Sequence, residues 1–133
     1  MGTRKYKLTD ETITIVRNGK EITLHRIEAL RDLAIAKTGD KGGYVESEAN
    51  LSHEGTCWIY GDAEVYGNAE VSGYAEVSGN AEVFGNAKVL GYATVFGYAT
   101  VGGNARVYDN AKVYGNAEVS GSSKVCGDTV LSV

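Results

Sequence analysis

The chain has 133 residues and a net charge of −4, and 43% of its residues are hydrophobic. It is long enough for one domain of ordinary size, and its apolar content is too high for a disordered chain. No run of 18 apolar residues is present, which excludes a membrane-spanning helix, and the start lacks the apolar segment of a secretory signal. We therefore expect a cytoplasmic protein.

The first part of the chain, residues 1–44, predicts a β-hairpin. Residues 13–17 alternate between apolar and polar side chains, as half-buried strands do. Asn18 and Gly19 form a favoured two-residue turn that leads into a second strand over residues 21–27. For residues 28–34, a helical turn and a continued strand both stay open.

From Ile59 onward a six-residue unit repeats. The unit reads Ala-x-Val-x-Gly-Asn, as in residues 63–68. An aliphatic residue recurs at every sixth position as far as Leu131, with a small residue two places before it. Glycine follows two places after it in every complete unit except one, in which Asp109 replaces it. A short fixed period of this kind indicates a solenoid.

The chemistry of the unit predicts how the solenoid coils. Ala and Val lie two places apart, so both point to the same face of a short strand. Gly and Asn supply a corner, because both tolerate the left-handed backbone conformation. Three strands close one triangular coil, which gives a period of 18 residues and about four to five coils. We place the first inward residues at Val45 and Leu51, with residues 52–55 as a loop.

This pattern resembles the hexapeptide-repeat superfamily, whose members form left-handed parallel β-helices and usually assemble as trimers. The resemblance implies an all-β fold with a hexapeptide-repeat β-helix over residues 45–133, and its handedness comes from the resemblance alone. Gly-Gly-Tyr-Val, Leu-Ser and Gly-Thr-Cys-Trp-Ile-Tyr follow one another in residues 42–60. Placed after a hairpin, they are similar to a subgroup of bacterial and phage proteins named only as transferases. Because an open solenoid end exposes strand edges and apolar core, we predict that residues 1–44 form a cap.

The period of 18 sorts the outward side chains onto three faces of the coil. Seven of the nine tyrosines fall outside the core in this register, which is more exposed aromatic surface than a small monomer usually carries. Self-association is the ordinary explanation, and the same residues could line a cleft between subunits. We predict a homotrimer whose contact lies on the third face and its corners, at Tyr60, Tyr92, Phe96, Tyr98 and Tyr114.

The second face carries a ladder of basic residues in an otherwise acidic solenoid: Lys88, Arg106 and Lys124. One explanation is a solvated face on which Glu70 pairs with Lys88. The other is a site for a small anionic ligand, in which Arg106 forks around a phosphate and Tyr108 stacks on a base. On the neighbouring face, Gly102 would leave a notch for an adenine-sized ring.

Evidence for catalysis is weaker. The resemblance implies that acyltransferases of this superfamily use a histidine as general base and lay acyl-CoA along the helix. This chain has only His25 and His53, and neither lies in the regular repeats. His53, beside Glu54 in the predicted loop, is a weak candidate, because an isolated loop histidine is more often solvated. The sequence shows no metal cluster, and Cys57 and Cys126 lack redox spacing, so we expect free thiols and no cofactor.

The sequence therefore predicts a non-catalytic homotrimeric module that captures a small anionic ligand, such as a nucleotide, at clefts between subunits. An acyltransferase that uses His53 and acyl-CoA is the alternative, and a purely structural protein is a further one. By analogy, a phage-encoded member would suit the sequestering of a host signalling nucleotide. Residues 59–133 carry four basic and eight acidic residues, which disfavours duplex nucleic acid as a partner. We expect no membrane partner.

Overall fold

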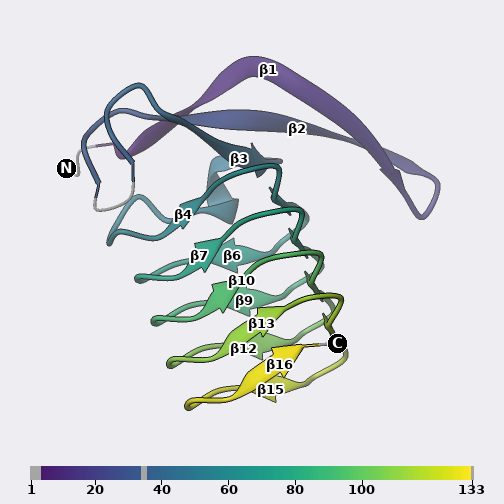
Figure 1. Cartoon of the computed structure of the whole chain (residues 1–133). Helices are drawn as coiled ribbons and strands as arrows, with labels where there is room; N and C mark the ends of the chain where they lie inside the picture. Colours follow the sequence, from purple (N-terminus) through teal and green to yellow (C-terminus); the bar gives the residue numbers. More distant parts are fainter. Residues whose placement is uncertain (1–3, 34–35, 133) are drawn as a thin grey trace.

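The computed structural model describes residues 4–33 and 36–132, and it is an all-β stack of coils beneath a long hairpin (Figure 1). The hairpin pairs β1 (Tyr6–Arg17) with β2 (Lys20–Ala29) in antiparallel fashion. Its turn residues, Asn18 and Gly19, have φ values of 53° and 76°, the conformation that such a turn requires. β2 continues as a strand to Ala29, whereas residues 34–35 lie outside the described residues.

The hairpin and the coils share one sheet. β3 (Lys41–Val45) pairs with β2 on one side and, in parallel, with the coil strand β5 (Glu64–Val65) on the other. A short 3₁₀ helix, η1 (Glu48–Asn50), follows, and the sequence pattern did not reveal it. Leu51 then bridges to Val71 in parallel, so residues 52–55 form the expected loop between coils.

The coils consist of very short strands joined by corners. Their bounds are β4 (Trp58–Ile59), β5 (Glu64–Val65), β6 (Glu70–Val71), β7 (Glu76–Val77), β8 (Glu82–Val83), β9 (Lys88–Val89), β10 (Thr94–Val95), β11 (Thr100–Val101), β12 (Arg106–Val107), β13 (Lys112–Tyr114), β14 (Glu118–Val119), β15 (Lys124–Val125) and β16 (Val130–Ser132).

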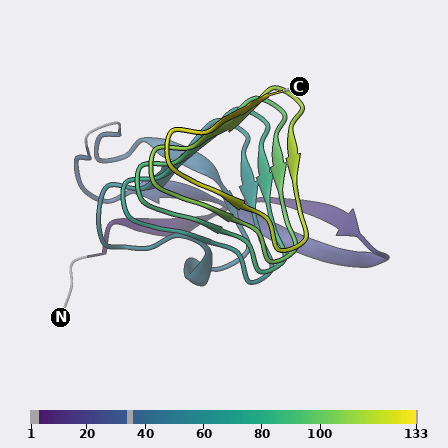
Figure 2. The same cartoon turned by 90° about the horizontal axis from the view of Figure 1, so that it is seen from below.

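Three parallel stacks of strands make the three faces of a triangular coil (Figure 2). The first face consists of β5, β8, β11 and β14, the second of β6, β9, β12 and β15, and the third of β4, β7, β10, β13 and β16. Each residue pairs with the residue 18 places later, as Val77 does with Val95. The predicted solenoid and its register are therefore confirmed, with five strands in the third stack.

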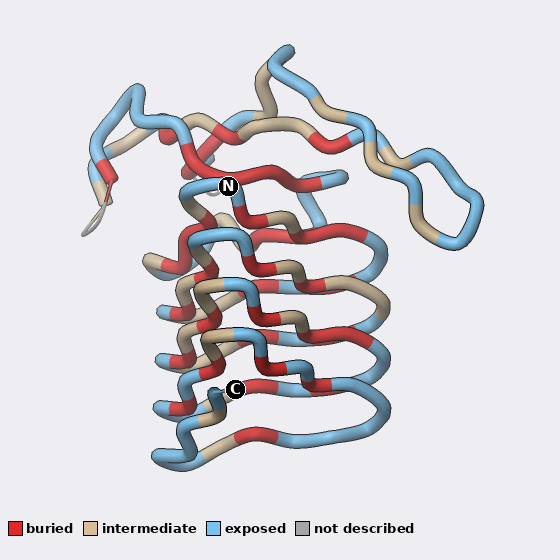
Figure 3. Tube along the Cα trace, turned by 45° about the vertical axis from the view of Figure 1, so that its right-hand side comes forward, coloured by how far each residue is buried: buried red, intermediate tan, exposed pale blue. Residues whose placement is uncertain are grey.

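The core of the coils consists of small and β-branched residues, and buried positions recur from coil to coil along the stack (Figure 3). From Ala63 to Val113 every inward Ala and Val is fully buried. The corner glycines have positive φ values, and Asp109, which stands in one corner position, adopts φ 58° as well. Glycine is thus favoured at the corners, because a side chain strains this backbone region. No helix in the described part of the chain is long and apolar enough to cross a membrane.

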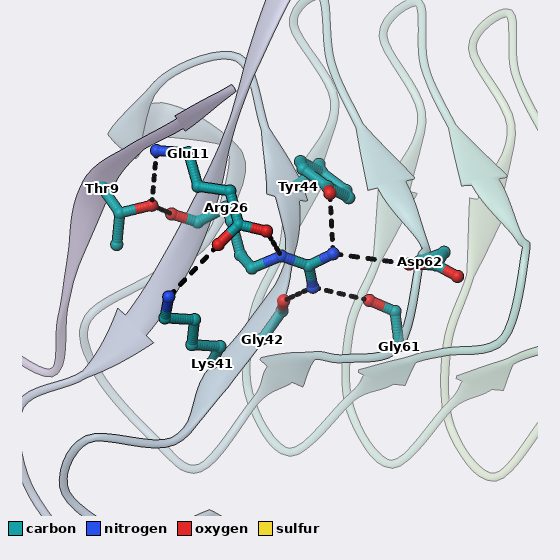
Figure 4. A network of polar contacts seen from close by, with 8 residues as sticks. All are labelled: Thr9, Glu11, Arg26, Lys41, Gly42, Tyr44, Gly61 and Asp62. Carbon is teal, nitrogen blue, oxygen red and sulfur yellow. Dashed lines mark hydrogen bonds and ion pairs between the residues drawn. The ribbon is translucent and has the colours of Figure 1, made fainter. Parts of the chain in front are cut away.

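One arginine ties the hairpin to the first coil (Figure 4). The Arg26 guanidinium lies 4.3 Å from the centre of the Tyr44 ring, and its side chain is largely covered. Its nitrogens lie within 3.4 Å of Glu11, the carbonyl oxygens of Gly42 and Gly61, the Tyr44 hydroxyl and Asp62. Because these contacts engage every nitrogen of the group, Arg26 positions the hairpin rather than offering donors to a ligand.

Candidate functional site

The basic ladder predicted from the sequence forms one continuous surface on the second face. Lys88, Arg106 and Lys124 are direct register partners on β9, β12 and β15, so their backbones lie about one strand spacing apart, roughly 4.8 Å along the stack. All three residues are exposed. Together with Leu90 and Tyr108 they line a hollow of about 430 Å³.

The charges of this hollow are not neutralised by neighbouring acids. Glu70 is the register partner of Lys88, yet the two side chains form no ion pair, so the expected Glu70–Lys88 pairing is absent. Within residues 4–33 and 36–132, no carboxylate lies within 4.0 Å of the ladder's three cationic groups. Like charges on adjacent strands repel one another, and an anion placed among them would relieve that repulsion.

Tyr108 lies beside the ladder and next to a thiol. It is half-buried, and the neighbouring Cys126 raises the pKa of its hydroxyl. A tyrosine hydroxyl is protonated at neutral pH and can donate a hydrogen bond. Both Cys57 and Cys126 are free, and Cys57 is buried.

The notch expected at Gly102 does not exist, and that prediction is wrong. Gly102 is buried, and a Cβ atom at this position would lie 2.6 Å from Cε2 and Cζ of Phe84. The Phe84 ring fills the space and stacks on Tyr66 from the coil above, with ring centres 5.5 Å apart. Glycine at this position therefore leaves room for the Phe84 ring and not for a ligand.

The third face carries the aromatic residues proposed for subunit contact. Tyr92 and Tyr98, at its two corners, are 62% and 66% exposed. The rings of Phe96 and Tyr114 stack 4.9 Å apart, and Tyr60 donates a hydrogen bond of 2.8 Å to Glu76. The structure thus places all five predicted residues along one side of the solenoid, and their role as a contact stays a prediction.

One tyrosine that the register placed outside the core is buried instead. Tyr66, on the first face, is 4% exposed. The hairpin causes this difference, because Leu24 and the half-buried Ile13, Ile15 and Ile22 pack onto a cluster that contains Tyr66 and Tyr44. The apolar residues of the hairpin thus cover part of a face that would otherwise be open.

His53, the weak catalytic candidate, is fixed on both of its ring nitrogens. Its Nδ1 accepts a hydrogen bond of 3.1 Å from the Lys5 backbone N–H, so the neutral ring carries its proton on Nε2. Nε2 lies 2.8 Å from Glu48 rather than beside Glu54. The ring also stacks on Tyr6 at 4.2 Å. A general base needs a free nitrogen lone pair, and this arrangement leaves none.

The other candidates offer no alternative centre. His25 is half-buried on the hairpin, with Nδ1 3.1 Å from the carbonyl oxygen of Thr9. Among the residues that the structure describes, no group of three or more His, Cys, Asp or Glu side chains could hold a metal ion. Of the two histidines, His53 thus has both ring nitrogens engaged, and His25 does not line the basic hollow.

A groove that the sequence did not predict lies between the hairpin tip and the first face. Arg17 reaches from the tip to Glu82, at 3.1 Å, and lies 3.9 Å from Glu64. Tyr66 donates a hydrogen bond of 3.0 Å to Glu82, and burial raises the pKa of Tyr66 to about 12. Burial, and secondarily Glu82, also raises the pKa of Glu64. The groove beside these residues has a volume of about 630 Å³.

A signal for this contact is present in the sequence, although it is weak. Glu64 and Glu82 are 18 residues apart and therefore stack directly on each other. Two carboxylates at such a spacing repel unless a cation stands near them. Arg17, adjacent to the turn of the hairpin, is that cation, but no periodic pattern links it to the coils.

Comparison with known proteins gives limited information. No protein-family model matches the chain. An Escherichia coli K12 protein named "Uncharacterized acetyltransferase YdcK" is 36% identical over 61 residues, which is 43% of this chain. The match covers 19% of that protein, so the chain spans about a fifth of the length of this relative. Together with the parallel stacked coils, this likeness fits the resemblance to the hexapeptide-repeat superfamily.

Proposed function

We propose that the second face of the solenoid binds a small anion that carries phosphate groups, such as a nucleotide. One observation carries the proposal: three cationic side chains stack in register around a hollow of about 430 Å³, and none of them forms an ion pair among the described residues. Arg106, in the centre, can grip a phosphate with two parallel hydrogen bonds. Lys88 and Lys124 supply point charges on either side of it.

The apolar wall of the hollow suits the remainder of a nucleotide. Leu90 and Tyr108 follow Lys88 and Arg106 by two residues, so they point to the same outward side, and both are half-buried. Binding sites for small molecules commonly combine such apolar walls with a few polar groups that fix orientation. Tyr108 offers a ring on which a base can stack and a hydroxyl that can donate a hydrogen bond.

The proposal includes assembly as a homotrimer through the third face. Its support is the exposure of Tyr92 and Tyr98 and the stacked pair formed by Phe96 and Tyr114. Tyr92 occupies a corner between the second and third faces, in the turn that joins β9 to β10. A subunit that packs on the third face would therefore border the basic hollow, which would become a cleft between subunits.

Calorimetric titration with ADP tests the anion site. Wild-type protein is expected to bind saturably, and binding should weaken as salt is raised because the contact is electrostatic. Arg106→Gln should weaken binding by about tenfold or more, since it removes a charged bidentate hydrogen-bond donor. Lys7→Gln, at an exposed position on β1 of the hairpin, removes the same charge elsewhere and should bind like wild type. Equal affinity in Arg106→Gln, or no binding by the wild type at millimolar ADP, would overturn the site.

Acyl transfer is the second candidate, and the likeness to a protein named as an acetyltransferase favours it. Acyl-CoA also carries phosphates, so the same basic face could hold it. His53 would be the base in this case, although its nitrogens contact Lys5 and Glu48. Turnover of acetyl-CoA that disappears in His53→Gln would support this candidate. Absence of CoA binding, or turnover that survives the substitution, would count against His53.

A further inference from the structure

We propose that the groove beneath the hairpin tip is a second ligand site, which takes a primary amine attached to an apolar body. The groove lies on the first face and is separate from the basic hollow of the second face. Its volume of about 630 Å³ falls within the range of small-molecule sites. The inference therefore goes beyond the anion site, and neither depends on the other.

Two rigid apolar surfaces form the sides of the groove. Ile22 from β2 lies on the hairpin side, and the ring of Phe84 lies on the coil side. Phe84 cannot move far, because its ring stacks on Tyr66 at 5.5 Å and covers Gly102 on its other side. Both Ile22 and Phe84 stay half-buried, so their remaining surface is available to an apolar ligand.

The lower end of the groove carries an acid without a partner. Glu118 is exposed and is the direct register partner of Thr100, and both residues line the groove. Among the described residues, no cationic group lies within 4.0 Å of Glu118. A carboxylate beside a hydroxyl can accept two of the three hydrogen bonds that an ammonium group donates.

The upper end of the groove sets the direction of the ligand. Arg17 and Lys20 lie there, and they repel a cation. The carboxylate of Glu82 is already engaged by Arg17 and by the Tyr66 hydroxyl. An ammonium group is therefore directed to Glu118 and Thr100, with its apolar body along Phe84 and Ile22.

The coil side of the groove is acidic. Glu64, Glu82 and Glu118 stand on β5, β8 and β14 of the same stack. Arg17 is shared between Glu64 and Glu82, so it cannot be given to a ligand without exposing that pair. The first and second faces thus have opposite charge on the same backbone frame.

A titration with phenethylamine tests this site on the full chain. Chemical shifts in a two-dimensional NMR spectrum should change saturably at β8, β11 and β14. 2-Phenylethanol has the same apolar body without the charge and should bind about tenfold more weakly. Glu118→Gln should weaken phenethylamine binding by a similar factor, whereas Glu70→Gln, an equally exposed acid on the second face, should leave it unchanged.

The outcomes separate this site from the anion site. If Glu118→Gln binds phenethylamine as tightly as wild type, or if the wild type shows no saturable shifts at 10 mM (a concentration about tenfold above a Kd of 1 mM), the amine site is wrong. ADP affinity is expected to be equal in Glu118→Gln and in wild type. If the wild type binds phenethylamine but not ADP, the proposal for the second face is wrong and the amine site stands.

Discussion

The coils and the N-terminal part up to Leu51 are stabilised in different ways. In the coils, equivalent Ala and Val residues repeat the same packing every six positions, and no single one is unique. In the N-terminal part, individual buried polar groups make contacts that occur once. The Lys5 ammonium group is fully buried and donates a 2.6 Å hydrogen bond to the carbonyl oxygen of Cys57. The buried Asn50 amide donates to the carbonyl oxygens of Gly67 and Ala69.

This difference shows where sites can arise in the molecule. Repetition gives the coils a regular frame on which outward residues stack at fixed spacing. A ladder of like charge therefore forms when three equivalent positions carry basic residues. The hairpin adds irregular contacts, and the groove on the first face exists only because the hairpin tip lies over it. The basic hollow is thus lined by residues of the regular coils alone, whereas the groove needs residues of both the hairpin and the coils.

The largest expected effect is loss of a unique contact in the N-terminal part. Tyr6 is fully buried, stacks on His53 and donates a 2.6 Å hydrogen bond to the carbonyl oxygen of Leu51. Tyr6→Ala should lower the free energy of unfolding by about 3–5 kcal/mol. Ser122→Ala, at an exposed corner of the coils between the first and second faces, should change it by about 0.5 kcal/mol or less. Urea unfolding measures both, and similar losses would remove the distinction between the two regions.

An intermediate effect is expected at the corners of the coils. A Cβ at Gly103 would lie 2.8 Å from the Gly121 nitrogen, whereas a Cβ at Gly121 would meet nothing within 4 Å. Both glycines have positive φ, 64° and 65°, so an alanine at either one costs about 1–2 kcal/mol of backbone strain. Gly103→Ala should lose a further ~1–3 kcal/mol because the coil below must shift. Equal losses in the two variants would show that strain alone makes glycine necessary.

The smallest effect is expected where the hairpin meets the first face. Because the pKa of Glu64 is raised, the folded protein binds this proton more readily than the unfolded chain does. Ionised Glu64 therefore lowers stability at pH 7, and this loss disappears as the pH falls below the ordinary value of 4.5. Glu64→Gln should raise the free energy of unfolding at pH 7, and this gain should shrink as the pH falls below 4.5.

Thermal unfolding across this pH range provides the measurement. Glu70→Gln, with an exposed side chain on the second face, serves as the control and should show no such trend. If Glu64→Gln were less stable than wild type at pH 7, the pairing with Arg17 would outweigh the burial of the acid. The contact at the hairpin tip would then contribute more to stability than the raised pKa indicates.

Much of the fold could be predicted because its causes are local and repeated. The unit Ala-x-Val-x-Gly-Asn predicts the inward column, and its period of 18 predicts the partners of Lys88 and Arg106 without further information. The turn at Asn18 and Gly19 could be predicted for the same reason, since two adjacent residues determine it.

The parts that could not be predicted depend on contacts distant in sequence. The burial of Tyr66 requires the hairpin to fold over the first face, and no pattern in the repeats records that contact. The Phe84 ring lies over Gly102, and the rotamer that places it there depends on the packing of neighbouring coils. His53 pairs with Glu48 rather than with Glu54, because η1 brings Glu48 back towards the loop.

The central claim is that the second face of the solenoid is an anion-binding surface. Two-dimensional NMR of the full chain during titration with inorganic pyrophosphate tests it most directly. We predict saturable shift changes confined to β9, β12 and β15, with the largest at Arg106, that weaken as salt is added. Shift changes concentrated on the first face, or their absence from the second face at saturating pyrophosphate, would contradict the account.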